Sequence, residues 1–262
     1  MLNIEEIFQE NNRLIDKAEK KAQRIVYTHL SNIFKTVKTS ATQRSIAQAL
    51  FEVELIRVSD FKLIYQEIYQ EVGFAMYQLE ASRLEKYKKS SPVSFFSEIW
   101  RQYVLRALNT QEITERITRV TQTTKDLVRS LLIQAQTNRL APREIARLFQ
   151  QNELNFSNIR ALRIARTETT YAAALGTEFA AQNSQLTLYK IWNHYKHGNY
   201  RDSHAAINKQ YVPISGKFTL PDGIKMRIPG DPAGGAKEVI NCRCNYTNLT
   251  MDALVELGYW KG

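Results

Sequence analysis

The sequence predicts an α+β fold in which a long all-helical region, residues 1–138, precedes a small domain with a short-stranded antiparallel or mixed sheet, residues 139–262. Apolar residues recur at the three- and four-residue spacing of helix faces in the first region. Before residue 175 the chain has only Gly73, Pro92 and Pro142 as helix breakers, whereas six Gly and four Pro lie between residues 198 and 235. Short β-prone runs follow residue 185.

Composition excludes several classes of protein. With 262 residues, 44% hydrophobic and 24% charged, the chain has the composition of an ordinary globular protein, long enough to fold without disulfides or metal. Its acidic first residues do not form a signal peptide, and no stretch approaches the ~18 apolar residues of a transmembrane helix. We therefore expect synthesis in a reducing cytoplasm and no membrane partner.

Three long amphipathic helices are expected first. The first has its apolar stripe between Ile4 and Val37 and is long enough to act as a contact arm. The second spans Phe61 to Leu79 and ends near Lys88–Pro92, because proline disfavours a helical residue before it. The third runs through Leu127 to Ala135.

Two further helices join the regions. Pro142 suits the first turn of one helix, and Ser157 is expected to cap the next. On that second helix Arg166 falls on the apolar seam. A buried guanidinium needs a partner, so we expect Arg166 to meet a carboxylate or carbonyl groups of the following domain; snorkelling to a rim is the alternative.

The sheet is expected from five short runs, separated by turn signals such as Pro221-Asp-Gly223. These runs are Leu186–Trp192, Gln210–Ile214, Lys217–Leu220, Ile224–Ile228 and Val239–Thr247. A last short helix spans Met251 to Leu257.

Nucleotide hydrolysis is excluded. The run from Gly230 to Lys237 has the glycine spacing of a phosphate loop. However, Ala236 intervenes before the lysine, no Ser or Thr follows it, and two prolines remove amide donors.

The cysteines and histidines form a weak metal motif. Cys242 and Cys244 with His194, His197 and His204 could supply soft ligands, but a one-residue gap is shorter than that of structural zinc sites. We expect no metal and no cofactor, and a buried thiol pair instead. His204, after Asp202-Ser203, lacks the partners of a hydrolytic triad and is expected to hydrogen-bond the adjoining loop.

Net charge, +10, divides equally between the halves of the chain. Residues 1–140 hold 21 basic against 16 acidic side chains, and residues 141–262 hold 15 against 10. In the second half the excess lies in residues 190–227, where only Asp202 and Asp222 oppose seven basic side chains: Lys190, Lys196, Arg201, Lys209, Lys217, Lys225 and Arg227. This segment is either a solvated surface or a DNA contact.

An ordered set of motifs is more specific than any one of them. The chain carries, in this order, Ile164-Ala-Arg-Thr-Glu-Thr169, Trp192, Tyr200-Arg-Asp-Ser-His-Ala205, Val212-Pro213, Phe218, Pro229-Gly-Asp-Pro232 and Glu238-Val-Ile-Asn-Cys-Arg-Cys244. This order resembles the phage Mu F-like family of head morphogenesis (minor capsid) proteins, which includes the SPP1 gene-product-7-like proteins. The resemblance covers residues 139–262.

The resemblance implies a tailed-phage virion protein inside the head near the portal vertex, acting in capsid assembly and in DNA packaging or delivery. It implies the portal protein as partner, with major capsid or scaffold protein and nonspecific double-stranded DNA as further contacts. Residues 1–138, outside the resemblance, are the candidates for portal docking. Where relatives often read Asp-x-Arg-x-Arg, this chain has Gly198-Asn-Tyr-Arg-Asp202, which speaks against an acidic or metal role for that loop.

Two functions follow for the motif residues. In the first, the protein is not an enzyme, and polar residues such as Arg166, His204 and Asn241 hold loops in place, so that Arg166→Ala or His204→Ala lowers stability. The motif residues are Arg166, Glu168, Trp192, Ser203, His204, Gly230, Asp231, Pro232, Asn241, Cys242 and Cys244. In the alternative, Arg166, Ser203 and Glu238 form an ADP-ribosyltransferase-like site on a distantly related fold, although Ala236 stands where a second Glu or Gln is usual.

Overall fold

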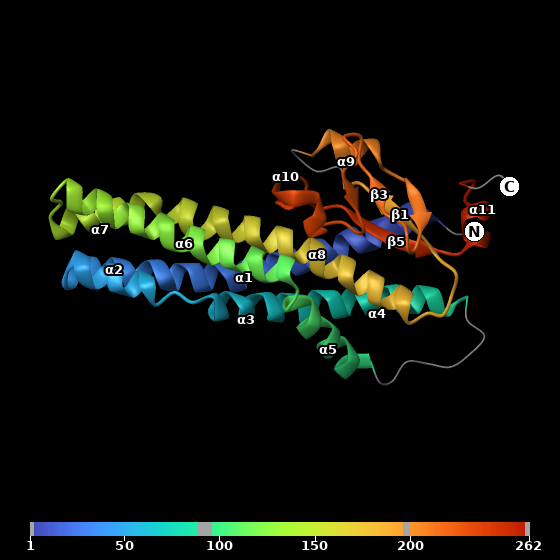
Figure 1. The fold of residues 1–262 in the computed structure, drawn as a ribbon, viewed down its shortest axis with the longest axis horizontal. Coiled ribbons are helices and arrows are strands. Elements are labelled where there is room, and N and C mark those ends of the chain that lie inside the picture. Colours follow the sequence, from blue (N-terminus) through green and yellow to red (C-terminus); the bar gives the residue numbers. More distant parts are fainter. Residues whose placement is uncertain (1–2, 88–95, 196–199, 260–262) are drawn as a thin grey trace. The chain divides into compact units, whose positions relative to one another are not determined.

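The computed structural model describes residues 3–87, 96–195 and 200–259, and confirms the predicted α+β class. The long helices are α1 (Ile4–Gln43), α2 (Ile46–Glu54), α3 (Val58–Ile68), α4 (Phe74–Glu85), α5 (Phe96–Leu108), α6 (Gln111–Thr137), α7 (Pro142–Glu153) and α8 (Arg160–Gln182) (Figure 1). The short helices are α9 (Asp202–Ala206), α10 (Gly235–Val239) and α11 (Met251–Glu256). The expected end of the second helix, Lys88–Pro92, lies outside the described residues.

The chain divides into two compact units. The unit that we call the sheet unit comprises residues 1–20, 67–105 and 166–262, and the helical unit comprises residues 21–66 and 106–165. The predicted boundary between residues 138 and 139 does not coincide with this division. The reason is that α1, α3, α5 and α8 each run from one unit into the other, so contacts rather than chain order define the units.

The helical unit is built on amphipathic stripes. Val26, Leu30 and Val37 of α1 are buried, and the ring of Phe34 packs against Phe149 and Phe156 at 4.9 and 4.8 Å. Buried positions of α6 follow helical spacing: Ile113, Ile117, Thr121, Thr124, Val128, Leu131, Leu132 and Ala135.

One predicted helix start in this unit is confirmed and the other is wrong. Pro142 occupies the first turn of α7, as expected. Ser157 does not cap α8: it lies in a π-helical turn, η2 (Leu154–Ile159), that joins α7 to α8 without a break. Phe156 and Ser157, both in this π turn, are buried.

The sheet unit contains two antiparallel sheets. The larger has the order β2 (Tyr211–Pro213), β1 (Tyr189–Asn193), β5 (Asn245–Leu249), and β3 (Phe218–Thr219) pairs with β4 (Lys225–Met226). Gly223, with φ +85°, makes the predicted turn between β3 and β4.

The beginning of α1 packs on the larger sheet. Ile4 and Phe8 form one buried cluster with Ile191, Leu249 and Leu254. Figure 1 shows β1 and β5 side by side and the N-terminal end of α1 beside α11. The beginning of α1 therefore contributes to the core of the sheet unit.

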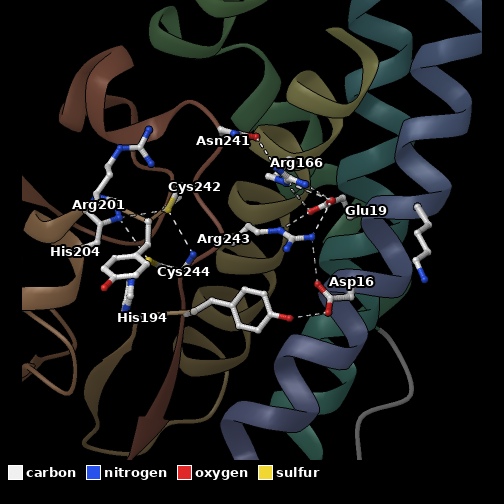
Figure 2. A pocket seen from close by; sticks show the side chains of 13 residues that line it. Asp16, Glu19, Arg166, His194, Arg201, His204, Asn241, Cys242, Arg243 and Cys244 are labelled. Atoms are coloured by element: carbon white, nitrogen blue, oxygen red, sulfur yellow. Dashed lines mark hydrogen bonds and ion pairs between the residues drawn. The ribbon is translucent and has the colours of Figure 1, made fainter. Parts of the chain in front are cut away.

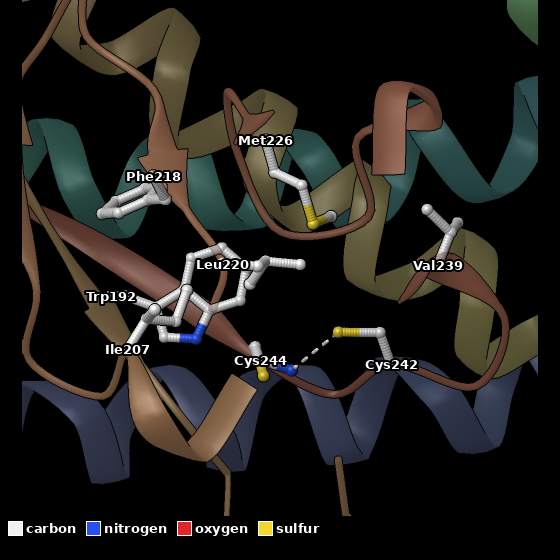
Figure 3. Close-up of a cluster of buried hydrophobic side chains, with 8 residues drawn as sticks. All are labelled: Trp192, Ile207, Phe218, Leu220, Met226, Val239, Cys242 and Cys244. Atoms are coloured by element: carbon white, nitrogen blue, oxygen red, sulfur yellow. Dashed lines mark hydrogen bonds between the residues drawn. The ribbon is translucent and has the colours of Figure 1, made fainter. Parts of the chain in front are cut away.

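A second core lies beneath the small hairpin (Figure 3). Trp192 packs edge-on against Phe218 at 5.0 Å and lies with Met226 and Val239 over the two cysteines. The thiols are thus covered on this side by apolar side chains.

The predicted strand Val239–Thr247 is wrong in its first half. Residues Gly235–Val239 form α10, Asn241 has a positive φ of 65°, and β5 begins only at Asn245. The intervening backbone is held by α8 instead of by a strand: Thr167 Oγ1 accepts from Asn241 N at 2.9 Å, and Thr170 Oγ1 donates to Cys242 O. Among the described residues no helix has the length and hydropathy needed to cross a bilayer.

Candidate functional site

A pocket of about 530 Å³ opens in the sheet unit (Figure 2). Its walls come from the start of α1, from α8, from α9, and from the segments that follow β1 and precede β5. The lining residues are Asp16, Glu19, Lys20, Arg166, His194, Tyr195, Tyr200, Arg201, His204, Asn241, Cys242, Arg243 and Cys244. Asp16, Glu19, Arg166 and Arg243 line one side of the pocket, and the thiols and imidazoles, with Arg201 beside them, line the other.

Glu19 is the shared anion of the charged side. Arg166 donates to its carboxylate at 3.2–3.3 Å, and Arg243 donates at 2.9–3.0 Å. Asp16 lies 3.6 Å from Arg243 and accepts from the Tyr195 hydroxyl at 3.0 Å. Because Glu19 is buried, it holds two guanidiniums in fixed positions on the pocket wall.

Arg166 therefore has the expected kind of partner, but from an unexpected element. Its carboxylate comes from α1, and the following domain supplies the Asn241 side-chain oxygen, which accepts from Nη1 at 3.0 Å. The snorkelling alternative is not what the structure shows, since the guanidinium is bonded on both sides.

The sulfur side of the pocket contains a compact cluster of His204, Cys242 and Cys244, all buried. His204 Nδ1 lies 3.6 Å from Cys242 Sγ and 3.4 Å from Cys244 Sγ, and the Cys244 backbone N–H donates to Cys242 Sγ at 3.4 Å. The hydrogen bond from the Cys244 side chain lowers the pKa of Cys242 well below its ordinary value, and burial raises the pKa of Cys244. The cysteines are free thiols.

Glu238 lies on the other side of the His204 ring. Its Oε2 is 3.1 Å from His204 Nε2 and accepts from Ser203 Oγ at 2.9 Å. The imidazole thus has a carboxylate at Nε2 and sulfur atoms at Nδ1. Among the described residues, the polar contacts of the His204 ring are therefore not to the adjoining loop, as expected, but to Glu238 of α10 and to the Cys242–Cys244 segment.

The three residues of the ADP-ribosyltransferase-like alternative do not converge on an open cleft. Ser203 and Glu238 contact each other, but Arg166 bonds to Glu19 and Asn241 instead. Glu238 is fully buried, and neither it nor Ser203 lines the pocket.

Other motif residues hold loops of the sheet unit. Glu168 accepts from the Tyr69 hydroxyl at 2.7 Å, and Gly230, with φ +80°, packs against the backbone of Tyr171. Asp231 accepts from the backbone N–H groups of Arg227 and Ala233, and Pro232 begins the 3₁₀ turn η3 (Pro232–Gly234). Trp192 is in the core described above.

The predicted DNA-contacting set is only partly available. Lys190 is wrong as a surface residue: it is 1% exposed, donates to the Arg227 carbonyl at 2.7 Å and lies over the Phe218 ring. Burial lowers its pKa to about 8. Its position in the central strand β1 places it inside.

Three more basic residues of that set are engaged in hydrogen bonds or ion pairs. Arg201 donates to the carbonyls of Lys237 and Ile240, Lys209 pairs with Glu5, and Arg227 pairs with Glu178. Lys217 and Lys225 are exposed on the small hairpin, and Lys196 lies outside the described residues. Of the six that the structure describes, Lys217 and Lys225 are therefore available to a phosphate backbone without breaking a described ion pair or hydrogen bond.

Sequence reasoning missed the buried polar residues of the N-terminal helix. Asn11 and Glu19 sit on the buried stripe of α1, at the spacing of Phe8, Ile15 and Ala22. Polar residues at core positions of an otherwise apolar stripe were the available signal, because they must find buried partners.

Comparison of the chain with models of known families, with curated proteins and with solved structures gives no match.

Proposed function

We propose that this chain is a head morphogenesis (minor capsid) protein of a tailed phage, bound to the portal protein inside the head and touching DNA without sequence preference. The observation that carries the proposal is that motif residues far apart in the sequence contact one another. Arg166 and Thr167 bond Asn241, and His204 lies against Cys242 and Cys244.

This mutual contact supports a shared structural role for the motifs. The motif residues lie in one cluster of the sheet unit. Their contacts fix the path of residues 241–244, which supports a structural role for the motifs. The cluster is also the reason to favour an assembly role over the enzymatic alternative.

The helical unit has the surface expected of a partner-docking region. Exposed large apolar side chains are concentrated there: Tyr27, Phe51, Leu55, Val58, Leu63, Leu127, Ile133, Leu154 and Ile159. Such side chains on helices supply anchors for a protein partner. We therefore assign portal binding to this unit.

The portal test uses the full chain and the portal protein of the same phage. We expect the two to co-purify, and Phe51→Asp with Leu63→Asp to weaken the association at least tenfold. Val255→Asp, an equally exposed apolar position in the sheet unit, is the matched control and should bind normally. Absence of association by the unaltered chain, at micromolar concentrations of both proteins, would reject the proposal.

DNA contact is assigned to the exposed pair Lys217 and Lys225. The double variant Lys217→Glu, Lys225→Glu should bind a random-sequence duplex more weakly and reduce the slope of log K against log[salt] by about 2, because each lost phosphate contact removes about 1. Fluorescence anisotropy at several salt concentrations measures both quantities.

The matched control for DNA binding carries the same charge change elsewhere. Arg24→Glu with Lys35→Glu alters two exposed residues of α1 in the helical unit. If this control lowers the salt slope as much as the hairpin variant does, DNA binding depends on net charge and not on the hairpin.

A further inference from the structure

The His204, Cys242 and Cys244 side chains form a preformed set of ligand atoms. One ring nitrogen and two sulfur atoms all lie within 4.8 Å of one another, in the buried floor of the pocket. Sequence spacing alone argued against a metal, because Cys242 and Cys244 are one residue apart. The fold supplies the third ligand from α9, which the spacing rule does not consider.

The distances match those of a tetrahedral zinc centre. With Zn–S of about 2.3 Å and Zn–N of about 2.0–2.1 Å, tetrahedral angles place nitrogen and sulfur about 3.5–3.6 Å apart. The observed Nδ1–Sγ distances are 3.6 and 3.4 Å. The two nitrogen–sulfur distances therefore already suit a shared ion, and the two sulfur atoms lie within 4.8 Å of each other.

Neighbouring polar groups hydrogen-bond or contact the ligand side chains, as the residues around a bound metal do. Glu238 at 3.1 Å from Nε2 favours the proton on that nitrogen and leaves the Nδ1 lone pair directed at the sulfur atoms. Ser203 bonds the same carboxylate oxygen, and the Cys244 N–H donates to Cys242 Sγ. Carboxylate–imidazole pairs of this kind commonly support metal-bound histidines.

Charge balance also favours a divalent ion. Two thiolates and a neutral imidazole cancel its charge, so the filled site is neutral in a buried environment where an uncompensated charge is unfavourable. Sulfur and imidazole donors suit zinc over magnesium or calcium. Three protein ligands leave a fourth position facing the pocket, where water or a ligand can bind.

We propose that His204, Cys242 and Cys244 bind one zinc ion, whose fourth coordination position opens into the pocket. This inference does not depend on the proposed function in phage heads. The ion would join α9 to the segment before β5 and fix the sulfur side of the pocket.

The experiment uses the reduced full chain and two probes, Zn²⁺ and Co²⁺. We expect one equivalent of zinc by elemental analysis and, on Co²⁺ loading, a sulfur-to-metal charge-transfer band with the intense visible bands of tetrahedral cobalt. X-ray absorption of the zinc form should report two sulfur ligands with one or two nitrogen or oxygen ligands.

Variants separate this site from nonspecific binding. Cys242→Ser and His204→Gln should abolish the charge-transfer band or weaken zinc binding at least 100-fold, whereas Glu238→Gln, which keeps the ligands, should weaken it 10–100-fold. His29→Gln, in the helical unit, is the control and should leave zinc content unchanged.

Three results would overturn the proposal. Each is measured on the unaltered chain, so none requires that a variant fold. The first is a zinc content below about 0.1 equivalent after the reduced, unaltered chain has been dialysed against micromolar Zn²⁺. The second is cobalt uptake without sulfur charge transfer. The third is a Cys242–Cys244 disulfide in the natively purified chain that, once reduced, takes up no metal.

Discussion

At the scale of single residues, the buried carboxylate of Glu19 fixes the positions of two arginines on the pocket wall. It is the common acceptor for Arg166 and Arg243, which come from α8 and from the segment before β5. Both guanidiniums keep about a fifth of their side chains exposed, at 21% and 18%. Without Glu19, two like charges would share this wall, and Asp16 would face only one of them.

We therefore predict that Glu19→Gln lowers the free energy of unfolding by about 2–3 kcal/mol, below the ~3–5 kcal/mol of a fully buried pair because both arginines are partly hydrated. Urea denaturation followed by circular dichroism measures the change. Glu98→Gln is the control, since Glu98 and Arg101 form an exposed pair on α5 and its loss should leave the midpoint unchanged. Equal midpoints for all three proteins would show that the Glu19 network adds no stability.

At the scale of elements, two helical segments of the sheet unit cross in direct backbone contact. Gly73 ends the π turn η1 (Tyr69–Gly73), which precedes α4, and Gly176 lies on α8. A Cβ at Gly176 would lie 2.0 Å from the Gly73 carbonyl oxygen, and one at Gly73 would lie 2.3 Å from the Trp100 ring. Gly73, the one glycine before residue 175, is thus explained by close helix packing.

Gly176→Ala should destabilise the protein, although alanine is the better helix former by about 1 kcal/mol. The atom in conflict belongs to the backbone and cannot move as a flexible side chain would, so we expect a loss of about 3 kcal/mol or more. Thermal unfolding measures it. Gln182→Ala, an exposed position on the same helix, is the control and should change little. A Gly176→Ala protein as stable as the control would mean that the helices separate easily.

Elements differ in how far the sequence could predict them. The stripes of α1, α6 and α7 and the Pro-Asp-Gly turn were predictable because the signals are local. The π turns were not, since a one-residue insertion barely changes an apolar pattern. The segment 239–244 was misassigned because Thr167 and Thr170 of α8, distant in sequence, bond the backbone that a strand partner would otherwise bond.

The candidate site shows the same limit. Arg166, His204 and the cysteines could be singled out as polar or soft groups at unusual positions. Their partners could not, because Glu19 lies 147 residues before Arg166 and a sequence gives no distance between such positions. Likewise, the burial of Lys190 depends on its place in the central strand of a sheet whose strand order no local pattern fixes.

At the scale of the molecule, the motif-bearing region is not self-contained. The sheet unit draws residues 1–20 and 67–105 into the same compact body as residues 166–262. Glu80 of α4 is fully buried and accepts from Thr247 and from the backbone of Asn248 in β5. The sheet therefore depends on helices that precede it by more than a hundred residues.

The isolated fragment 139–262, which the family resemblance covers, should consequently fail to fold by itself. It lacks Ile4 and Phe8, so Ile191, Leu249 and Leu254 lose their apolar cover, and Arg166 and Arg243 lose Glu19. Unpaired charges and an uncovered sheet face both oppose a stable fold. We expect no cooperative thermal transition and poor dispersion of amide resonances, in contrast to the full chain. If the fragment gave resonances that overlie those of the full chain, the first helix would be an appendage, and its role would be confined to the contact arm that its length suggests.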